Sequence, residues 1–335
     1  MVTIRDISKE CGVSVSTVSK ALNGYGDISE ETAELVRRTA RRMHYIPNNA
    51  ARQLKTNISH NIGVLFIDET QSGLTHEYFA AILNGTRDEA EKLGYDITFI
   101  GHNIGGQPMS FLEHCRNRKC DGVVIACVNF ESEPVIELVK SEVPVITIDY
   151  SYDSVSSVMS DNMEGGYQLA SYLIRMGHRK IAYICGERTS VTNKRLIGVK
   201  RALKDNGIAM PEKYLVQGRY HDAGISRQAT RQLMALPDPP TAIMYPDDFS
   251  YLGGMIELER MGLKVPDDIS VVGYDGVPIS QTIRPKLTTY FQDADRIGRL
   301  SARKLVEKIE HSETCMAEEI QVSGRLLEGT SVRQI

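Results

Sequence analysis

From residue 62 onward the chain repeats one pattern, in which a short and almost wholly apolar run is followed by a stretch with helical periodicity. The apolar runs span residues 62–67, 97–100, 122–128, 145–148, 181–184, 242–245 and 269–273. Continuous apolar strands that alternate with helices are typical of parallel sheets covered by helices on both faces. The series divides near Asp161 into two halves, each about the size of a doubly wound domain. The sequence therefore predicts an α/β core of two lobes with a cleft between them.

The first 46 residues differ from this core because they contain helix signals only. Thr3 opens a Thr-x-x-Asp capping pattern, Ser14 precedes a second short helix, and Ser29 precedes a third. A polar connector without a strand pattern follows, in which Asn48 can cap one further short helix.

These signals predict three parts: an all-α helix-turn-helix head, a hinge helix, and the two-lobed α/β core of parallel sheets. The expected bounds are residues 1–47 for the head, 48–60 for the hinge and 61–335 for the core. Within the core, we expect the first lobe to comprise about 61–161 plus 292–320, and the second about 162–291 plus 321–335.

Residues 4–22 have the spacing of a helix-turn-helix. Apolar or small residues stand where the two helices would meet, with a glycine at the turn: Ile4, Ile7, Ser8, Cys11, Gly12, Val13, Val18 and Leu22. In such a unit the second helix enters the major groove of DNA, and its first residues reach the base edges. Val15, Ser16 and Lys20 are then the expected readers of bases, while Ser14 caps the helix and contacts phosphate. A helical hairpin without a DNA-binding role is the alternative.

Charge is distributed unevenly along the chain, whose net charge is -4. Residues 1–60 carry +3 and the remainder carries -7, and residues 35–67 contain six basic residues and no acid. A basic module ahead of an acidic body is expected of a phosphate-binding head on a solvated core. A solvated helix face is the alternative explanation of the basic residues.

Several of the predicted strands end in a carboxylate, namely Asp68, Asp149, the pair Asp247 and Asp248, and Asp275. The carboxyl ends of strands in open parallel sheets face the ligand crevice, so these acids are expected to point toward a polar ligand. Capping of the helix that follows each strand is the alternative for every one of them.

Other classes of protein are excluded by what the sequence lacks. No apolar stretch approaches the roughly 18 residues of a membrane helix, and the N-terminus lacks the features of a signal peptide, so we expect a cytoplasmic protein without a membrane partner. Six irregularly spaced cysteines indicate neither a disulfide framework nor a zinc site, and His311 with Cys315 supplies only two ligands. No Walker loop, serine elbow or HExxH motif is present, so no cofactor, metal or catalytic residue is expected. Asp247 and Asp248 should point to opposite sides of an extended strand, which a glycosidase pair does not do.

Taken together, these motifs resemble the lactose-repressor/galactose-repressor family of bacterial transcription regulators over essentially the whole chain. The N-terminal motifs are residues 3–24, 45–48, and 50–54 followed by 61–64. The core motifs are residues 161–162, 165–166, 177–181, 195–198, 266–275 and 285–289.

The resemblance implies a core like that of sugar-binding periplasmic proteins, with DNA affinity controlled by a small molecule between the lobes. The expected partners are a near-palindromic double-stranded operator, bound by a homodimer, and a small sugar-like effector. Contacts with DNA are expected from Thr3, Ser14, Val15, Ser16, Thr17, Lys20, Asn23, Ala51, Arg52, Leu54 and Lys55. Contacts with the effector are expected from Tyr78, Phe79, Asp149, Arg195, Tyr220, Asp247 and Asp275.

Some of these roles have structural alternatives. Arg195 could be a salt-bridge partner within one lobe, and Tyr78 with Phe79 could belong to a helix core. The acids favour a neutral or amine-bearing sugar over an anion. Two other classes of protein also fit parts of the chain: a cytoplasmic solute-binding protein without a DNA role, which leaves residues 1–60 without a function, and a sugar-acting enzyme, which lacks its catalytic motif.

Overall fold

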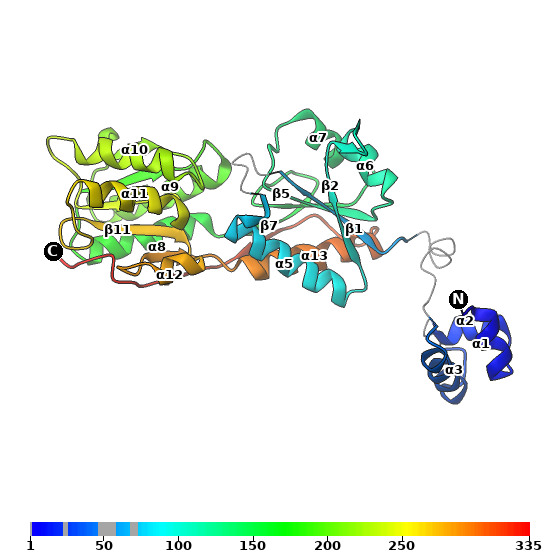
Figure 1. The fold of residues 1–335 in the computed structure, drawn as a ribbon. Coiled ribbons are helices and arrows are strands. Elements are labelled where there is room, and N and C mark those ends of the chain that lie inside the picture. The colour runs from blue at the N-terminus through cyan, green and yellow to red at the C-terminus, as the bar shows by residue number, and fades with distance from the viewer. Residues whose placement is uncertain (1, 23–25, 46–57, 68–72) are drawn as a thin grey trace. The chain divides into compact units, whose positions relative to one another are not determined.

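The computed structural model of the chain describes residues 2–22, 26–45, 58–67 and 73–335. It contains two compact units, Met1–Ser59 and His60–Ile335. The first unit is all-α and the second is α/β, as the sequence predicts (Figure 1).

The first unit packs three helices, α1 (Ile4–Cys11), α2 (Val15–Leu22) and α3 (Glu30–Arg42), around a small apolar core. The Thr3 amide and hydroxyl both donate to Asp6, at 2.8 and 2.7 Å, which caps α1. Gly12 ends α1 with a φ of 67°, a left-handed conformation that a glycine adopts without strain. The buried apolar side chains are Ile7, Val18, Ala21, Ala33, Val36 and Ala40, with Ile4, Cys11, Val13 and Leu22 packed against them.

The first lobe of the second unit is built on a six-stranded parallel sheet with the order β13-β7-β6-β5-β1-β2. Its strands are β1 (Asn61–Phe66), β2 (Asp96–Ile100), β5 (Gly122–Ala126), β6 (Val145–Ile148), β7 (Ser156–Ser160) and β13 (Glu319–Val322). Its helices are η1 (Gly73–Thr75), α5 (Glu77–Lys92), α6 (Phe111–Asn117), α7 (Glu133–Lys140) and α13 (Ala294–Glu310), with a small hairpin of β3 (Asn103–Ile104) and β4 (Gln107–Pro108).

The second lobe has a six-stranded sheet with the order β14-β12-β11-β10-β8-β9, in which only β14 is antiparallel. Its strands are β8 (Ile181–Cys185), β9 (Leu215–Gln217), β10 (Ala242–Met244), β11 (Ser270–Asp275), β12 (Thr288–Phe291) and β14 (Arg325–Leu327). Its helices are α8 (Asn162–Arg175), α9 (Ser190–Asp205), η2 (Glu212–Tyr214), α10 (Ala223–Met234), α11 (Asp248–Arg260) and α12 (Pro278–Thr282). The chain passes between the lobes after β7, after β12 and after β13.

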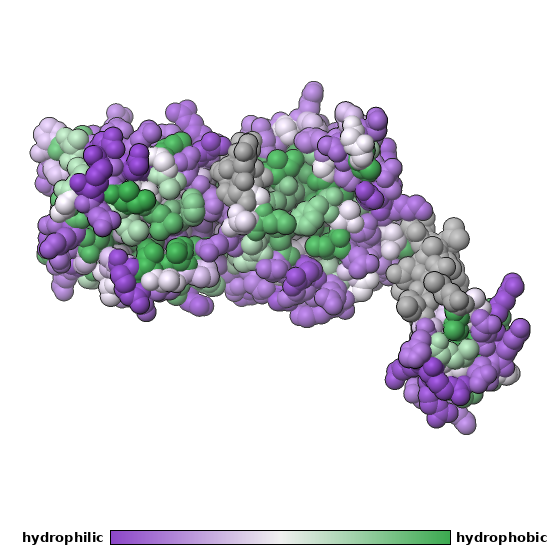
Figure 2. Space-filling view, viewed as in Figure 1, coloured by the Kyte–Doolittle hydropathy of each residue, from purple (hydrophilic) through white to green (hydrophobic). Residues whose placement is uncertain are grey.

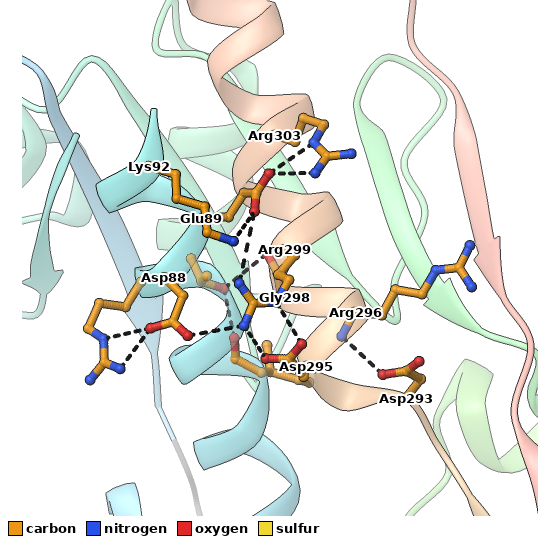
Figure 3. Close-up of polar contacts among 12 residues, drawn as sticks. Asp88, Glu89, Lys92, Asp293, Asp295, Arg296, Gly298, Arg299 and Arg303 are labelled. Atoms are coloured by element: carbon orange, nitrogen blue, oxygen red, sulfur yellow. Dashed lines mark hydrogen bonds and ion pairs between the residues drawn. The ribbon is translucent and has the colours of Figure 1, made fainter. Parts of the chain in front are cut away.

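Helices α5 and α13 lie side by side in the first lobe (Figure 1) and are joined by a network of ion pairs (Figure 3). Arg299 of α13 donates to Asp88 of α5 at 3.0 Å and to Asp295 at 2.7 Å. Arg303 donates to Glu89 of α5 at 3.1 Å through Nε, and the Glu89 side chain is only 8% exposed. The network therefore fixes the position of α13, which follows the second crossover between the lobes, on α5, which begins beside the cleft described below.

Gly298 allows this close packing, because a Cβ atom there would lie 2.0 Å from the Ile82 carbonyl oxygen. We expect Gly298→Ala to push α13 away from α5 and to lower the free energy of unfolding by about 1 to 3 kcal/mol. Urea unfolding measures this change. Gly101→Ala is the matched control, because a Cβ at Gly101 meets no atom within 4 Å. Equal losses in the two variants would contradict the packing argument.

Candidate functional site

The exposed start of α2 carries the side chains expected to read DNA. Val15 is 41% exposed and Ser16 is also exposed, whereas Val18 on the opposite face is buried. The Ser14 hydroxyl accepts from the Thr17 amide at 3.0 Å and lies 2.8 Å from the Thr17 hydroxyl, so both residues form the helix cap. Lys20 forms an ion pair with Asp27. The surface thus presents Val15 and Ser16, with Lys20 on the same helix, an arrangement suited to a groove of DNA once Lys20 exchanges Asp27 for a phosphate or base.

Five of the expected DNA contacts lie outside the described residues: Asn23, Ala51, Arg52, Leu54 and Lys55. Most of the expected hinge, residues 48–57, lies outside them as well. Thr3 is described and exposed, and its hydroxyl donates to Asp6 within the cap of α1.

The second candidate site lies where the carboxyl ends of strands in the two lobes meet. Asp149 follows β6 of the first lobe and Asp275 ends β11 of the second. Asp149, Asp275 and His221 have φ values of 58°, 98° and 52°, a left-handed conformation that side-chain-bearing residues seldom adopt. Backbone strain of this kind gathers at functional sites, where the surrounding structure has to maintain it.

Asp149 is held between two donors. Its Oδ1 accepts from the Ser160 amide and its Oδ2 from the Tyr78 hydroxyl, both at 3.0 Å. Burial raises the pKa of Asp149 above its ordinary value, and burial together with the Asp149 charge raises that of Tyr78. The Tyr78 hydroxyl therefore serves as a donor at neutral pH. Phe79, the next residue of α5, is partly buried and packs on the rings of Phe66 and Tyr78.

Arg195 of α9 is the cation of this site, and its side chain is 6% exposed. Its Nε donates to Asn162 Oδ1 at 2.8 Å and its Nη1 to the Pro246 carbonyl oxygen at 2.9 Å. The guanidinium lies 3.5 Å above the centre of the Tyr274 ring, while its Nη2 approaches Asp275 Oδ1 at 4.0 Å. Arg195 thus binds Asn162 and Pro246 within its own lobe and also approaches Asp275 at the cleft.

Asp275 also accepts a hydrogen bond from Gln292 Nε2 at 2.7 Å. Burial raises its pKa to about 7, although the Arg195 charge acts in the opposite direction, and the nearby Asp247 charge raises the pKa further. A carboxyl group that titrates near neutrality beside an arginine is typical of a functional site.

The adjacent acids Asp247 and Asp248 do not have the geometry expected from the sequence. The expectation that they lie in an extended strand is wrong, because β10 ends at Met244 and Asp247 is the N-cap of α11. Asp247 accepts from the Ser250 amide at 2.7 Å and from the His221 amide at 2.8 Å, so the helix-capping alternative describes it. Asp248 accepts from the Thr289 hydroxyl at 2.6 Å and from the Val277 amide at 2.9 Å. Both carboxylates thus bind the protein's own donors.

Tyr220 completes the set: its hydroxyl lies 2.8 Å from that of Thr192, and its ring lies 5.3 Å from the Arg195 guanidinium. The structure thus brings Tyr78, Asp149, Arg195, Tyr220 and Asp275 to one region. It adds residues that the sequence analysis missed, namely His76, His221, Phe249, Tyr274 and Gln292. None of them belongs to a periodic pattern or follows a predicted strand as an acid, so no signal in the sequence singled them out.

A small cavity lies beside Tyr78 and Asp275. It measures about 10 Å³ and is lined by His76, Glu77, Tyr78, His221, Phe249, Asp275 and Val277. Such a volume holds about one water molecule. A larger hollow of about 400 Å³, lined by residues such as His102, Met109 and Glu133, includes none of the cleft residues.

A helical head with a helix-turn-helix, together with a two-lobed α/β core that has a polar cleft, defines a ligand-responsive DNA-binding regulator. The family model of the bacterial regulatory proteins of the lacI family matches residues 3–48. The model of the periplasmic binding proteins and sugar binding domain of the LacI family matches residues 59–327. The chain belongs to the LacI family of bacterial transcription regulators, and the predicted fold class is confirmed.

Relatives and solved structures agree with this assignment. The chain is 31% identical to the HTH-type transcriptional repressor PurR of Pectobacterium carotovorum, over 99% of this chain and 97% of the relative. It is also 31% identical to the HTH-type transcriptional repressor PurR of Mannheimia succiniciproducens, over 100% of this chain and 100% of the relative. The Lac repressor dimer bound to operator and the anti-inducer ONPF has a TM-score of 0.76 at 26% identity, covering 99% of both chains. A complex of the transcriptional regulator CelR with cellobiose has a TM-score of 0.72 at 26% identity, covering 99% of this chain and 100% of that one.

Among the described residues, no helix has the length and apolar character needed to cross a bilayer.

Proposed function

We propose that the protein is a repressor that binds a near-palindromic operator as a homodimer and responds to a small sugar-like effector in the cleft. The observation that carries the proposal is the pairing of an exposed α2 start in the head with the cluster of Asp149, Arg195 and Asp275 in the core. A solute-binding protein without a DNA role would leave the head unused, and neither Asp247 nor Asp248 has a carboxylate oxygen free of protein donors for catalysis. Since the DNA that a bacterial regulator binds lies in the cytoplasm, we place the protein there.

Base reading by α2 is tested by exchanging two residues, Val15→Ser together with Ser16→Val. We expect the preferred base pairs to change, by about 1 to 3 kcal/mol at each affected position, because these side chains meet the base edges. Selection of bound sequences from a random library measures the preference. As a comparison, Arg52→Ala or Lys55→Ala should weaken binding to all sequences alike and flatten its salt dependence. An unchanged consensus sequence in the exchange variant would show that α2 does not read bases.

For the hinge we propose that a short helix around residues 48–54 forms only on DNA, since about two turns are too few to be stable alone in water. Ala51 would let two such helices approach each other, and Leu54 would wedge into a minor-groove step. Unchanged operator affinity and bending in Leu54→Ala would contradict the wedge.

The dimer doubles the base contacts of a small head. On the face of the core drawn in Figure 2, hydrophobic residues gather on both lobes and are bordered by hydrophilic ones. Phe99, on the edge strand β2 of the first lobe, is 47% exposed, and Ile256 on α11 of the second lobe is 51% exposed. An unpaired edge strand with an exposed aromatic residue favours coverage by another chain. Sedimentation should show dimers, and a monomer or tetramer at all concentrations would overturn this part.

The charged side chains of the cleft favour an effector without negative charge. Asp149 and Asp275 face the cleft, where the charges of Arg195 and Lys194 act on Asp149 and that of Arg195 on Asp275. An anion placed between the two carboxyl groups would still meet repulsion that a neutral or amine-bearing sugar avoids. Hydroxyl groups can donate to the carboxylates and accept from Arg195 Nη2. The cellobiose in the CelR complex and the ribose in a LacI-family regulator of Enterococcus faecium (26% identity, TM-score 0.71, covering 82% of this chain and 99% of that one) support this class.

A thermal-shift screen of the full chain tests the effector class. The compounds are mono- and disaccharides, purines and phosphosugars. An effector present at 100 times its dissociation constant should add about 2.7 kcal/mol to the stability. We expect stabilisation by neutral or amino sugars, and stabilisation by phosphorylated or purine ligands alone would refute the assignment.

A further inference from the structure

Four aromatic rings form a column that crosses the cleft. The His76 and His221 rings are stacked with their centres 4.1 Å apart and their planes 21° apart. His221 is also stacked on Phe249, at 3.9 Å and 14°. On the other side, the edge of Phe79 meets His76 at 4.8 Å. The order of the column is therefore Phe79, His76, His221, Phe249.

The junction of this column lies between the lobes. His76 and Phe79 belong to the start of α5 in the first lobe, and Phe249 belongs to α11 in the second. His221 follows Tyr220 in the second lobe with a φ of 52°, and its amide donates to Asp247 at 2.8 Å. Asp247 thus holds His221 in a conformation that directs its ring onto His76. The two histidines form the step at which one lobe meets the other.

Among the described residues, the side-chain contacts between the lobes away from the three crossovers are weaker. The Ser190 hydroxyl donates to the Asp149 carbonyl oxygen at 3.4 Å, and Lys194 approaches Glu319 at 3.9 Å with both side chains well exposed. A long hydrogen bond and an exposed ion pair contribute little to stability. A stacked pair of rings contributes more, and His76 is only 8% exposed. Among these contacts, the histidine stack is therefore the one best able to hold the lobes together.

The stack lies beside one of the cleft carboxylates. The cavity next to it measures about 10 Å³ and is lined by His76 and His221 together with Tyr78 and Asp275. A sugar ring is many times larger than this cavity, so it cannot occupy the space between the stack and Asp275 while the two imidazoles touch.

We propose that His76 and His221 form a latch that holds the two lobes together across the cleft, and that the effector enters by parting them. This inference rests on the proposed function, in which a sugar-like molecule binds between the lobes. Once parted, the two imidazoles contact the effector from opposite lobes. Their faces pack on the C–H surface of a sugar ring, and their nitrogens exchange hydrogen bonds with its hydroxyl groups. His76 and His221 are thereby effector-binding residues in addition to closing the cleft.

The latch is tested in the full chain without effector by a double-mutant cycle. His76→Leu and His221→Leu keep apolar bulk and remove the stacked rings. If the rings touch in solution, the effects of the two substitutions on the unfolding equilibrium constant should differ from additivity by roughly threefold to tenfold. His76→Phe with His221→Phe is the matched control, because it keeps two stackable rings and should retain most of the coupling. Additive effects in the leucine cycle overturn the latch, and they do so whatever the effector is.

The claim that the effector enters by parting the two histidines is tested with cellobiose and ribose as probes. With a probe that stabilises the unsubstituted protein, we expect His76→Leu to speed association at least threefold, because the cleft no longer has to be unlatched. Dissociation should be faster as well, because one imidazole contact is lost. An unchanged association rate overturns the gating role. Coupling between the histidines without binding of either probe leaves the latch standing and counts against the proposed effector class.

Discussion

Replacing Asp275 by asparagine should make the core more stable and effector binding weaker. Burial raises the pKa of Asp275 from its ordinary value of 3.8 to about 7. Between these values the folded protein holds a proton that the unfolded chain has released, so stability decreases as the pH rises from about 4 to about 7. Asparagine carries no charge, so its free energy of unfolding should not fall over this pH range, and the variant should become more stable than the original protein as the pH rises. We expect the two to be similar near pH 4.5, and the variant to be more stable by on the order of 2 to 4 kcal/mol at pH 8.

Urea unfolding at the two pH values measures this difference. Asp222→Asn is the matched control, since Asp222 is the N-cap of α10, accepts from the Ile225 amide at 2.9 Å, and is not among the charges that shift the pKa of Asp275. We expect that variant to differ from the original protein by less than about 0.5 kcal/mol at either pH, because asparagine caps a helix about as well as aspartate. Asp275→Asn should also bind the effector about 1 to 3 kcal/mol less tightly, because it loses the anionic acceptor. A variant no more stable than the original protein at pH 8 would show that the Asp275 charge is well compensated. The gain we expect is the stability that the protein gives up by keeping a buried carboxylate for effector binding.

The apolar strands could be predicted because each is a continuous apolar run in the sequence. The polar strands contain no such run and could not be predicted. Strand β7 reads Ser-Ser-Val-Met-Ser and is buried along its whole length, yet it has too few apolar residues to stand out. Strand β12 begins with two buried threonines, and the hydroxyl of Thr289 donates a hydrogen bond to Asp248 at the start of helix α11. A polar strand is stable in the interior only because of partners far away in the sequence, and no local pattern reports them.

The cleft was predictable in part for a similar reason. The rule that strand ends face the crevice located Asp149, Asp247 and Asp275, but it does not separate a ligand-facing acid from a helix cap. Asp247 caps because α11 begins at the very next residue, whereas Asp149 and Asp275 have left-handed backbones and no helix starts directly after them. The stacking of His76 on His221 depends on how two lobes meet, and it lies beyond any local rule.

Replacing Arg195 should greatly lower the free energy of unfolding. Arg195→Met keeps the apolar stem and leaves Asn162, the Pro246 carbonyl group and the Tyr274 ring without their guanidinium partner. It also removes the cation 4.0 Å from Asp275, so at pH 8 the buried carboxyl takes up a proton, at a cost that its pKa of about 7 limits to about 1 to 2 kcal/mol. Together with the lost hydrogen bonds and ring contact, we expect the free energy of unfolding to fall by about 3 to 5 kcal/mol at pH 8. Near pH 4.5 Asp275 is protonated, so the loss should shrink to the part that comes from the hydrogen bonds and the ring contact.

The same reasoning predicts how Arg195→Met and Asp275→Asn combine. With asparagine at position 275 no buried charge remains, so Arg195→Met should be less harmful in that background at pH 8 than in the original protein. Unfolding of the four proteins of this cycle at pH 8 measures the coupling. An equal loss in both backgrounds would mean that Arg195 stabilises the fold only through Asn162, Pro246 and Tyr274. If Arg195 is instead the cation that both balances Asp275 and binds the effector, the folded Arg195→Met protein should still bind operator DNA, and its binding should no longer respond to effector.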